Sequence, residues 1–208
     1  MKNTAFTIDT NIFMHYEYNM DALISDMRPI IEIIRQPNDT QNRRGGGKTC
    51  IVISEIIVHE STFLFNKNYS KLLKPLTTPD KKTSTFDRKR TKDLLDGLQK
   101  KIDNLNDIQY FIKKSGAQVL SYRGVTMDQL MNAYFTSEPP FSNTGRKKRE
   151  FPDAIALFSM EQWRKKNKAD MIAVSQDSDW EKFSAVTDSW YCERTVENAV
   201  AEFVRMSR

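Results

Sequence analysis

The chain has 208 residues, of which 39% are hydrophobic, so it can bury a sizeable core as one large domain or as one domain with an insertion. Its net charge of +5 is modest, so the distribution of charge says more than the total. No apolar run approaches a membrane span, and the N-terminal MKNTAFTID turns acidic before a signal sequence could form; we therefore expect a cytoplasmic protein with no membrane partner. Its two cysteines, Cys50 and Cys192, match no zinc-binding spacing and are expected to stay reduced.

Short β-rich apolar runs alternate along the chain with longer segments of helical spacing. The predicted strands are AFTID at 5–9, TCIVI at 49–53, AQVLS at 117–121, DMIAVS at 170–175 and a short WYC at 190–192. The predicted helices are an interrupted stretch that ends at Arg35, then 54–67, 87–114, 126–135, 150–166 and 195–204. Strands that alternate with helices imply an α/β sandwich around a mainly parallel sheet.

The loop before the second predicted strand contains GGGKT, which looks like the end of a phosphate-binding P-loop. The full fingerprint needs a glycine where this chain has Asn42, and it needs a helix directly after the Lys-Thr pair. A strand is predicted there instead. We therefore expect the glycines to serve loop flexibility and to bind no nucleotide.

Basic residues gather in three places. They outnumber acidic residues between Lys67 and Lys101, and they form RKKR at 146–149 and RKKNK at 164–168. Clusters of this kind are typical of proteins that bind a polyanion, although any single cluster is better explained by a solvated helix face. Three clusters in one chain favour the polyanion.

Carboxylates stand near the carboxyl ends of the predicted strands, where parallel sheets build their sites. Asp9 ends the first strand, and Asp177 and Asp179 follow the fourth. Glu60 lies in the helix after the second strand, and Asp153 lies in the first turn of an apolar helix. Taken singly, each has an ordinary role as a helix N-cap, a first-turn acid or a surface residue. Four carboxylates in one place repel one another unless divalent cations compensate, and oxygen ligands select Mg²⁺ or Mn²⁺.

Other catalytic chemistries have little support in the sequence. The only histidines, His15 and His59, have no partner pattern for acid–base catalysis, and His15 is expected to be a packing residue. The chain lacks the G-x-S-x-G, CxxC and GxGxxG motifs. An Asp-x-Asp phosphatase is disfavoured because Asn11 stands where the second Asp should be.

Four segments, FTIDTNIF, SEIIVHE, FPDAIAL and VSQDSDW, resemble the motifs of PIN-domain nucleases in their order and spacing. The segment PPFSNTGRKKREFPDA resembles a bacterial PIN-like group. The resemblance covers most of the chain. It implies a PIN-like three-layer α/β/α sandwich with a four- to five-stranded sheet, formed by residues 1–208 as one domain with a basic helical insertion at about 68–115.

The resemblance also implies a functional site. The expected catalytic residues and metal ligands are Asp9, Glu60, Asp153 and Asp177, with Asp179 as a further metal ligand. Asn11, Glu150 and Ser175 are expected to support them. The expected RNA-binding residues are Arg146, Lys147, Lys148 and Arg149, while Arg43, Arg44 and Lys48 are weaker candidates because their loop enters the sheet at the opposite edge.

The function implied is a Mg²⁺- or Mn²⁺-dependent endoribonuclease that cleaves single-stranded RNA by attack of a metal-activated water. Its expected settings are toxin, anti-phage defence effector or RNA processing enzyme. We also expect an inhibitory or activating protein partner and a homo-oligomer, with a dimer favoured. Exposed aromatic residues such as Trp180 or Phe141 could stack on a base, although core packing is favoured for Trp180. Two alternatives stay open: a catalytically inactive RNA-binding or scaffold module, and a structure-specific DNA nuclease.

Overall fold

The computed structural model describes residues 3–36, 47–77, 97, 107–141 and 150–206. Its centre is a sheet of five strands in the order β3-β2-β1-β4-β5, and every neighbouring pair is parallel. The strands are β1 (Asn3–Ile8), β2 (Thr49–Ser54), β3 (Gln118–Leu120), β4 (Ala169–Val174) and β5 (Trp190–Glu193). The fold class predicted from the sequence is confirmed.

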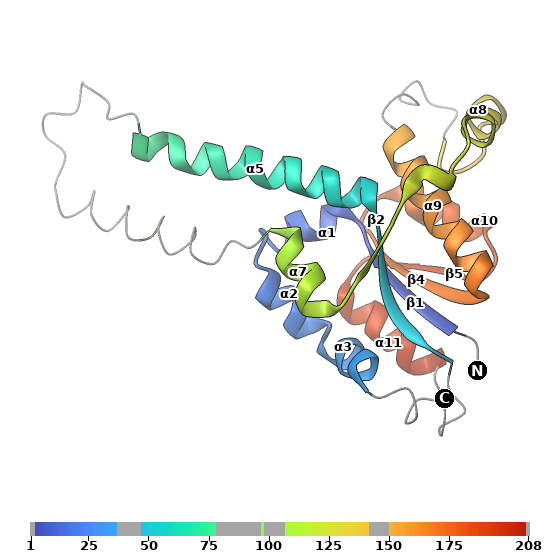
Figure 1. Cartoon of the computed structure of the whole chain (residues 1–208), viewed down its shortest axis with the longest axis horizontal. Coiled ribbons are helices and arrows are strands. Elements are labelled where there is room, and N and C mark those ends of the chain that lie inside the picture. Colours follow the sequence, from blue (N-terminus) through green and yellow to red (C-terminus); the bar gives the residue numbers. More distant parts are fainter. Residues whose placement is uncertain (1–2, 37–46, 78–96, 98–106, 142–149, 207–208) are drawn as a thin grey trace, which may run out of the picture.

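The helices cover both faces of this sheet, as Figure 1 shows. They are α1 (Thr10–His15), α2 (Met20–Asp26), α3 (Arg28–Arg35), α5 (Glu55–Thr77), α7 (Ile108–Ser115), α8 (Met127–Thr136), α9 (Phe151–Asn167), α10 (Ser178–Val186) and α11 (Val196–Met206). A short 3₁₀ turn, Tyr122–Gly124, links β3 to α8. No helix in the part of the chain that the structure describes is long and apolar enough to cross a membrane.

Successive side chains of β1 contact helices on opposite faces of the sheet. Phe6 packs edge-on against Phe203 of α11, with ring centroids 5.2 Å apart. Its neighbour Thr7 points to the other face, where its Oγ1 lies 2.9 Å from the sulfur of Met160 in α9. Successive side chains of a strand point to opposite faces, so these contacts define an α/β/α sandwich.

The register between β1 and β4 fixes where the functional edge lies. Their six residues pair in step, from Asn3 with Ala169 to Ile8 with Val174. Both strands therefore end level, and the residues that follow, Asp9 and Ser175, emerge side by side. A backbone bond from the Asp9 N–H to the Val174 carbonyl, 2.9 Å long, continues the ladder to this point.

The predicted strands agree with the observed ones to within about two residues, and the short fifth strand is present. The helix predicted at 54–67 is too short, because α5 continues to Thr77. Most of the insertion at about 68–115 and of the helix predicted at 87–114 lies outside the described residues. Gly47 and Lys48 lead directly into β2, so a strand follows the Lys-Thr pair, as expected, and the P-loop interpretation has no helix to support it.

Candidate active site

The four candidate carboxylates come from four separate elements at the carboxyl edge of the sheet. Asp9 follows β1, and Asp177 follows β4 at the start of α10. Glu60 lies in the second turn of α5, which leaves the end of β2, and Asp153 lies in the first turn of α9. Their charges interact: Asp9, Glu60 and Asp177 each raise the pKa of Asp153. The sequence suggested that these four residues share a site, and in the structure they lie close enough for the other three charges to affect Asp153.

Asp9 is the buried centre of the group. Only 5% of it is exposed, and its carboxylate accepts hydrogen bonds from the Thr10 N–H at 2.6 Å and from the Ser175 hydroxyl at 2.7 Å. Burial raises its pKa to about 7, with smaller contributions from the charges of Glu60 and Asp177, while the two hydrogen bonds act in the opposite direction. A carboxyl group that titrates near neutrality responds strongly to a neighbouring cation.

Asp153 shows the same behaviour from the opposite side of the site. It is half-buried, and burial is the main reason that its pKa rises to about 8, followed by the charges of Asp9, Glu60 and Asp177. The indole N–H of Trp180 is completely buried and makes no hydrogen bond of normal geometry, yet it lies near enough to favour the ionised form of Asp153. The indole N–H is therefore a buried donor that lies near the Asp153 carboxylate without a hydrogen bond of normal geometry.

Thr10 links Glu60 to the start of α1. Its buried side chain donates a hydrogen bond of 2.7 Å from Oγ1 to Oε2 of Glu60. Glu60 itself is exposed, so this bond is what holds its carboxylate towards Asp9. Sequence analysis did not single out Thr10, although its place directly after Asp9 at the end of a parallel strand was a signal that it faces the site.

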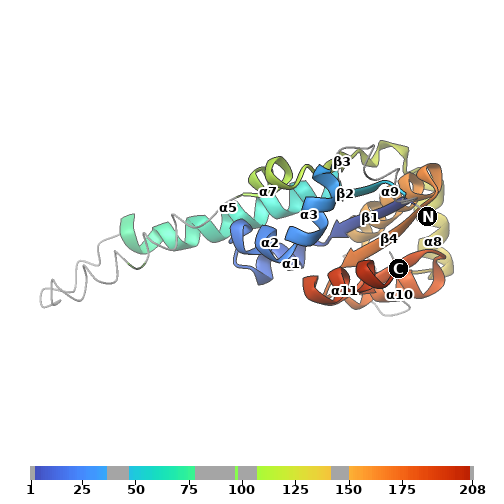
Figure 2. The ribbon, with the colours of Figure 1, turned by 90° about the horizontal axis from the view of Figure 1, so that it is seen from below.

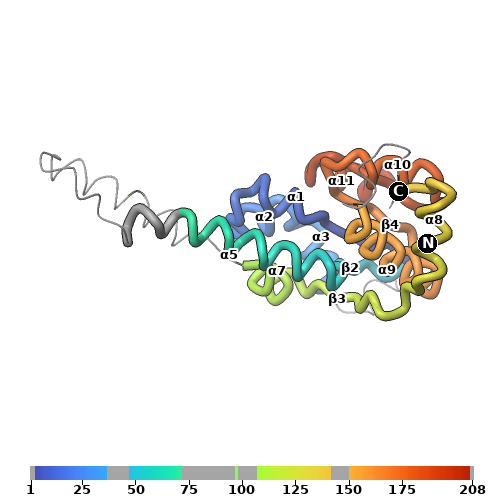
Figure 3. Tube along the Cα trace, turned by 90° about the horizontal axis from the view of Figure 1, so that it is seen from above, coloured from blue at the N-terminus to red at the C-terminus, as the bar shows by residue number. Residues whose placement is uncertain are grey.

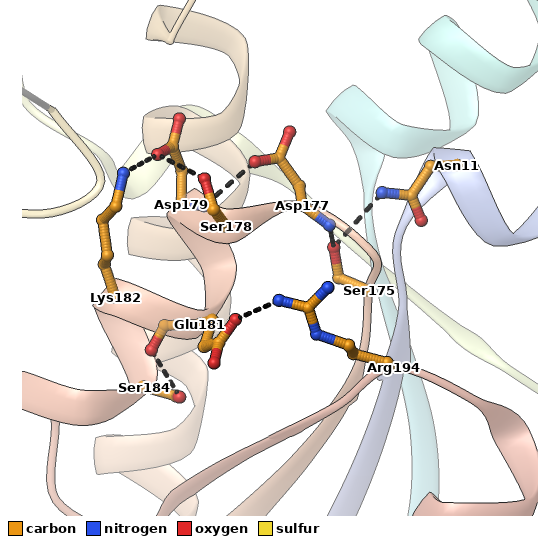
Figure 4. A network of polar contacts seen from close by, with 9 residues as sticks. All are labelled: Asn11, Ser175, Asp177, Ser178, Asp179, Glu181, Lys182, Ser184 and Arg194. Atoms are coloured by element: carbon orange, nitrogen blue, oxygen red, sulfur yellow. Dashed lines mark hydrogen bonds and ion pairs between the residues drawn. The ribbon is translucent and has the colours of Figure 1, made fainter. Parts of the chain in front are cut away.

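Ser175 joins the elements on the other side of Asp9, and Figure 4 shows part of this network. Its hydroxyl donates to Asp9 and accepts from the Asn11 side chain at 3.3 Å and from the Asp177 N–H at 3.0 Å. A serine hydroxyl has one donor and two acceptor sites, so all three are used. The Asn11 side chain in turn accepts from the Gln176 N–H at 3.3 Å. Ser175 and Asn11 therefore lie where the resemblance placed supporting residues.

Asp177 and Asp179 differ in their surroundings, as Figure 4 also shows. Asp177 caps α10 by accepting from the Asp179 N–H at 2.9 Å, and its charge raises the pKa of both Asp9 and Asp153. The Asp179 carboxylate instead pairs with Lys182 at 2.8 Å. Asp177 is therefore the better member of the acidic group, while Asp179 is already neutralised by a neighbour.

The other residues that the sequence singled out are Glu150, the basic candidates, two aromatic residues and His15. Glu150 is buried at the N-cap position of α9, and its charge contributes to the raised pKa of Lys182. The predicted RNA-binding residues Arg146, Lys147, Lys148 and Arg149 lie outside the described residues, as do Arg43 and Arg44, and Lys48 is exposed beside the first residue of β2, away from the acidic group. The core packing favoured for Trp180 is confirmed, because Trp180 is 0% exposed. The suggestion that Phe141 stacks on a base is wrong, because Phe141 is 2% exposed. His15 was expected to pack inside but is exposed in the last turn of α1.

A pocket of about 260 Å³ opens beside Ser175, between the end of β5 and helices α10 and α11. Arg194 lines it and forms an ion pair of 2.7 Å with Glu181. Both side chains are more than half exposed, so this pair contributes little stability and leaves the arginine accessible. Arg194 follows β5 directly, but the predicted fifth strand ended one residue earlier, at Cys192, so the sequence did not single Arg194 out.

The chemistry of the donor set fits a hard divalent cation, because all four groups are carboxylates. Their placement is looser: among the described residues, no three His, Cys, Asp or Glu side chains form a group that could hold a metal ion as they stand. The acids are thus within range of one another's charge but not gathered at ligand distances. Glu60 and Asp177 are exposed, so their side chains can rotate inward without unpacking the core.

A parallel α/β/α sandwich with an acidic group at the carboxyl edge of its central strands defines the class of α/β proteins that build a site at the ends of their strands. Within that class, the chain belongs to the PIN-domain family, since a family model described as PIN domain matches residues 7–180. PIN domains are in general nucleases, typically metal-dependent. Neither a comparison with curated proteins nor a comparison with solved structures found a match.

Proposed function

We propose that the protein is a Mg²⁺- or Mn²⁺-dependent endoribonuclease that cleaves single-stranded RNA at the carboxyl edge of its sheet. The observation that carries the proposal is that four carboxylates lie at one edge of the sheet, where burial and neighbouring charges raise the pKa of two of them. Burial, followed by the charges of Glu60 and Asp177, raises the pKa of Asp9 to about 7. Burial, followed by the charges of Asp9, Glu60 and Asp177, raises the pKa of Asp153 to about 8. Groups perturbed in this way mark functional sites more often than structural ones. Membership of the PIN-domain family supports the same function.

Each residue has a distinct part in this proposal. Asp9, which is buried, and Asp153, which is half-buried, provide oxygen ligands for the ion from inside the site. Glu60 and Asp177, which are exposed, provide the remaining oxygen ligands from the solvent side. The Ser175 hydroxyl fixes the orientation of Asp9, and Thr10 holds Glu60 near it. When bound, the divalent ion lowers the pKa of a coordinated water and neutralises charge on the phosphate. The hydrolysis leaves a 5′ phosphate and a 3′ hydroxyl.

Arg194 is positioned to hold the RNA backbone near the site. It lies across the Ser175 pocket from the acidic group, and a guanidinium is suited to paired hydrogen bonds with phosphate oxygens. The basic cluster at Arg146–Arg149, which immediately precedes α9, remains a proposed second contact.

The test compares cleavage by the wild type and by Asp153→Asn. We expect the wild type to cut labelled single-stranded RNA with Mg²⁺ or Mn²⁺, to stop in EDTA, and to leave 5′-phosphorylated products. Asp153→Asn should lower the rate at least about a hundredfold, since it removes a charged oxygen ligand. Asp128→Asn is the matched control, because Asp128 is an exposed acid in the first turn of α8, as Asp153 is an acid in the first turn of α9.

Two outcomes would point elsewhere. Cleavage that survives both EDTA and Asp153→Asn would rule out a metal–carboxylate site. Preference for a DNA substrate in competition would favour the DNA nuclease. If the protein binds RNA without cutting it, and Mg²⁺ or Mn²⁺ leaves its melting temperature unchanged, it is a binding or scaffold module.

The biological setting is proposed from the resemblance alone. A role as a toxin or defence effector predicts that expression of the wild type arrests growth of a bacterial host while Asp153→Asn does not. A regulatory protein partner would suppress that arrest when co-expressed. The proposed dimer is tested by light scattering on the purified protein.

A further inference from the structure

Helix α5 contributes Glu60 to the site, and it also has an inner face that packs on the domain and an outer face that is exposed. Its inner face packs on the domain through buried or half-buried residues, among them Ile57, Ser61 and Phe65. Phe65 packs edge-on against Tyr18, with ring centroids 5.3 Å apart, and stacks on Tyr69 at 6.0 Å. The aromatic residues on this side of α5 therefore have partners that explain them.

The outer face of α5 carries a line of exposed residues that starts at the acidic group. Glu60, Phe63, Lys67 and Lys71 follow one another at spacings of three and four, which places them along one stripe of the helix, and each is exposed. Asn66 and Ser70 lie beside this stripe and are also exposed. Eleven residues of helix span about 16 Å, at about 1.5 Å per residue. The helix runs away from the sheet in this direction, as Figures 1, 2 and 3 show.

Phe63 is the feature that a merely solvated helix face does not explain. Its side chain is 66% exposed, one turn from Glu60, while the other apolar side chains described between residues 55 and 71 are buried or half-buried. A flat aromatic ring with lysines one and two turns further on is the arrangement that proteins use to bind unpaired nucleic acid, since the ring stacks on a base and the ammonium groups contact phosphates. Stacking on a ring requires an unpaired base, so the arrangement selects a single strand.

We propose that Phe63, Lys67 and Lys71 form a binding track for single-stranded RNA, which leads the strand along α5 to Glu60 and the acidic group. The inference rests on the proposed function and deepens it, because it assigns the side from which the substrate enters. Phe63 stacks on a base close to the cleavage point, and the two lysines neutralise phosphates further from it. The track recognises the backbone and the presence of an unpaired base and reads no sequence.

The experiment measures binding apart from cleavage. The anisotropy of a short labelled single-stranded RNA is followed in EDTA with Asp153→Asn as the parent protein. Adding Phe63→Ala should weaken binding about tenfold, the typical effect of losing one stacked base. Phe135→Ala is the matched control, because Phe135 is equally exposed, at 74%, on α8. It should leave the affinity unchanged.

The lysines are tested by the salt dependence of the same binding. Each phosphate contact to a single strand adds about 0.7 to the slope of log affinity against log salt, so Lys67→Gln with Lys71→Gln should reduce the slope by about 1.4. Lys113→Gln with Lys114→Gln removes the same charge from exposed positions in the last turn of α7, which lie outside the three basic clusters, and should not reduce it. Unchanged melting temperatures confirm that the variants fold.

The outcomes separate the track from the proposed catalysis. A parent protein that binds no RNA, or track variants that bind no worse than their controls, would overturn the track even if the wild type cuts RNA. Loss of binding confined to the track variants supports it even if the wild type cuts nothing. If Phe63→Ala alters only the oligomeric state in light scattering, the stripe is a contact between copies of the chain and the track is wrong.

Discussion

At the scale of single residues, structural and chemical roles coincide. Asp9 and Asp177 each cap a helix, the role that an ordinary acid has at these positions, and each also contributes charge to the acidic group. Asp9, which is buried, and Asp153, which is half-buried, have raised pKa values, so each tends to hold a proton near neutral pH when no cation is present. A site of this kind stores electrostatic strain that binding of a cation relieves.

The pH dependence of stability follows from the raised pKa values. Asp153 has a pKa of about 8 in the folded protein against 3.8 for a free aspartate side chain, so between about pH 4 and 8 the folded state holds a proton that the unfolded state has released. Stability therefore falls as pH rises through this window. In EDTA at pH 8, Asp153→Asn should melt about 2–4 °C above the wild type for each kcal/mol of strain removed, and near pH 4 the gain should vanish.

Scanning calorimetry at the two pH values checks this prediction, with Asp128→Asn as the control. The control should show no comparable gain, because Asp128 is exposed. A destabilised Asp153→Asn at pH 8 would mean that the carboxylate has a structural role.

Ser175 provides a test of how Asp9 is positioned. Its hydroxyl lowers the pKa of Asp9, so Ser175→Ala should raise that pKa further and shift the pH–rate profile to higher pH. The variant also leaves Asn11 and the Asp177 N–H without their acceptor, and activity should fall by about 10–100-fold. Ser184→Ala is the matched control, because the Ser184 hydroxyl bonds only the backbone of its own helix. A lower rate with an unshifted pH profile would contradict the role given to Ser175.

At the scale of elements, α9 is tied to β5 at the end remote from the site. The Glu161 carboxylate accepts from Arg164 at 2.6 and 2.9 Å and from the Trp190 indole at 2.6 Å. Burial opposes ionisation of Glu161, yet the hydrogen bonds from Arg164 and Trp190 hold its pKa below the ordinary value. The same contacts set the position of α9, the helix that carries Asp153.

Glu161→Gln should lower the free energy of unfolding by about 2–3 kcal/mol, because it leaves a mostly buried arginine without its counter-charge. Glu202→Gln breaks a pair with the same spacing, to Arg205 on α11, but that arginine is 69% exposed and the cost should stay below about 1 kcal/mol. Since the pKa of Glu161 is lowered, its contribution is present above the unfolded pKa and is lost as pH falls. Urea titrations at pH 7 and pH 3 would show the difference between the two variants shrinking at the lower pH, and equal costs at pH 7 would contradict the prediction.

At the scale of the whole molecule, the two cysteines report on the sheet as a unit. Both are free, one on β2 and one on β5, on opposite sides of the central strand. Burial raises the pKa of Cys50 to about 11 and that of Cys192 to about 12, where nearby acids add to the effect. At neutral pH the thiolate that reacts with alkylating agents is therefore scarce.

We expect both thiols to react slowly in the native protein and at a common rate once unfolding of the sheet becomes limiting. Mass spectrometry of alkylated peptides over a series of urea concentrations measures the two rates separately. Early reaction of Cys192 alone would show that the β5 edge opens independently of β2.

The sequence predicted the fold because strand and helix periods are local signals, and the run TCIVI needs no tertiary context to be recognised. Helix α5 was underestimated because Asn66 and Asn68 resemble a stop signal, whereas Phe65 and Tyr69 continue its inner face. Asp9 and Asp177 were predicted from their places at strand ends, and Glu60 and Asp153 from their places in helices that start near that edge of the sheet. The bonds of Thr10 and Ser175 were not, because side-chain partners depend on how distant segments meet.

The pairing of β1 with β4 also determines how much of the chain must be made before the acidic group can be complete. Ser175 lies 166 positions after Asp9, and β4 supplies the strand that β1 must pair with before Asp177 can approach. A chain emerging from the ribosome therefore carries Asp9 and Glu60 for most of its synthesis without Asp153, Ser175 or Asp177. The acidic group is therefore complete only once the chain has been made as far as Asp177 and α10.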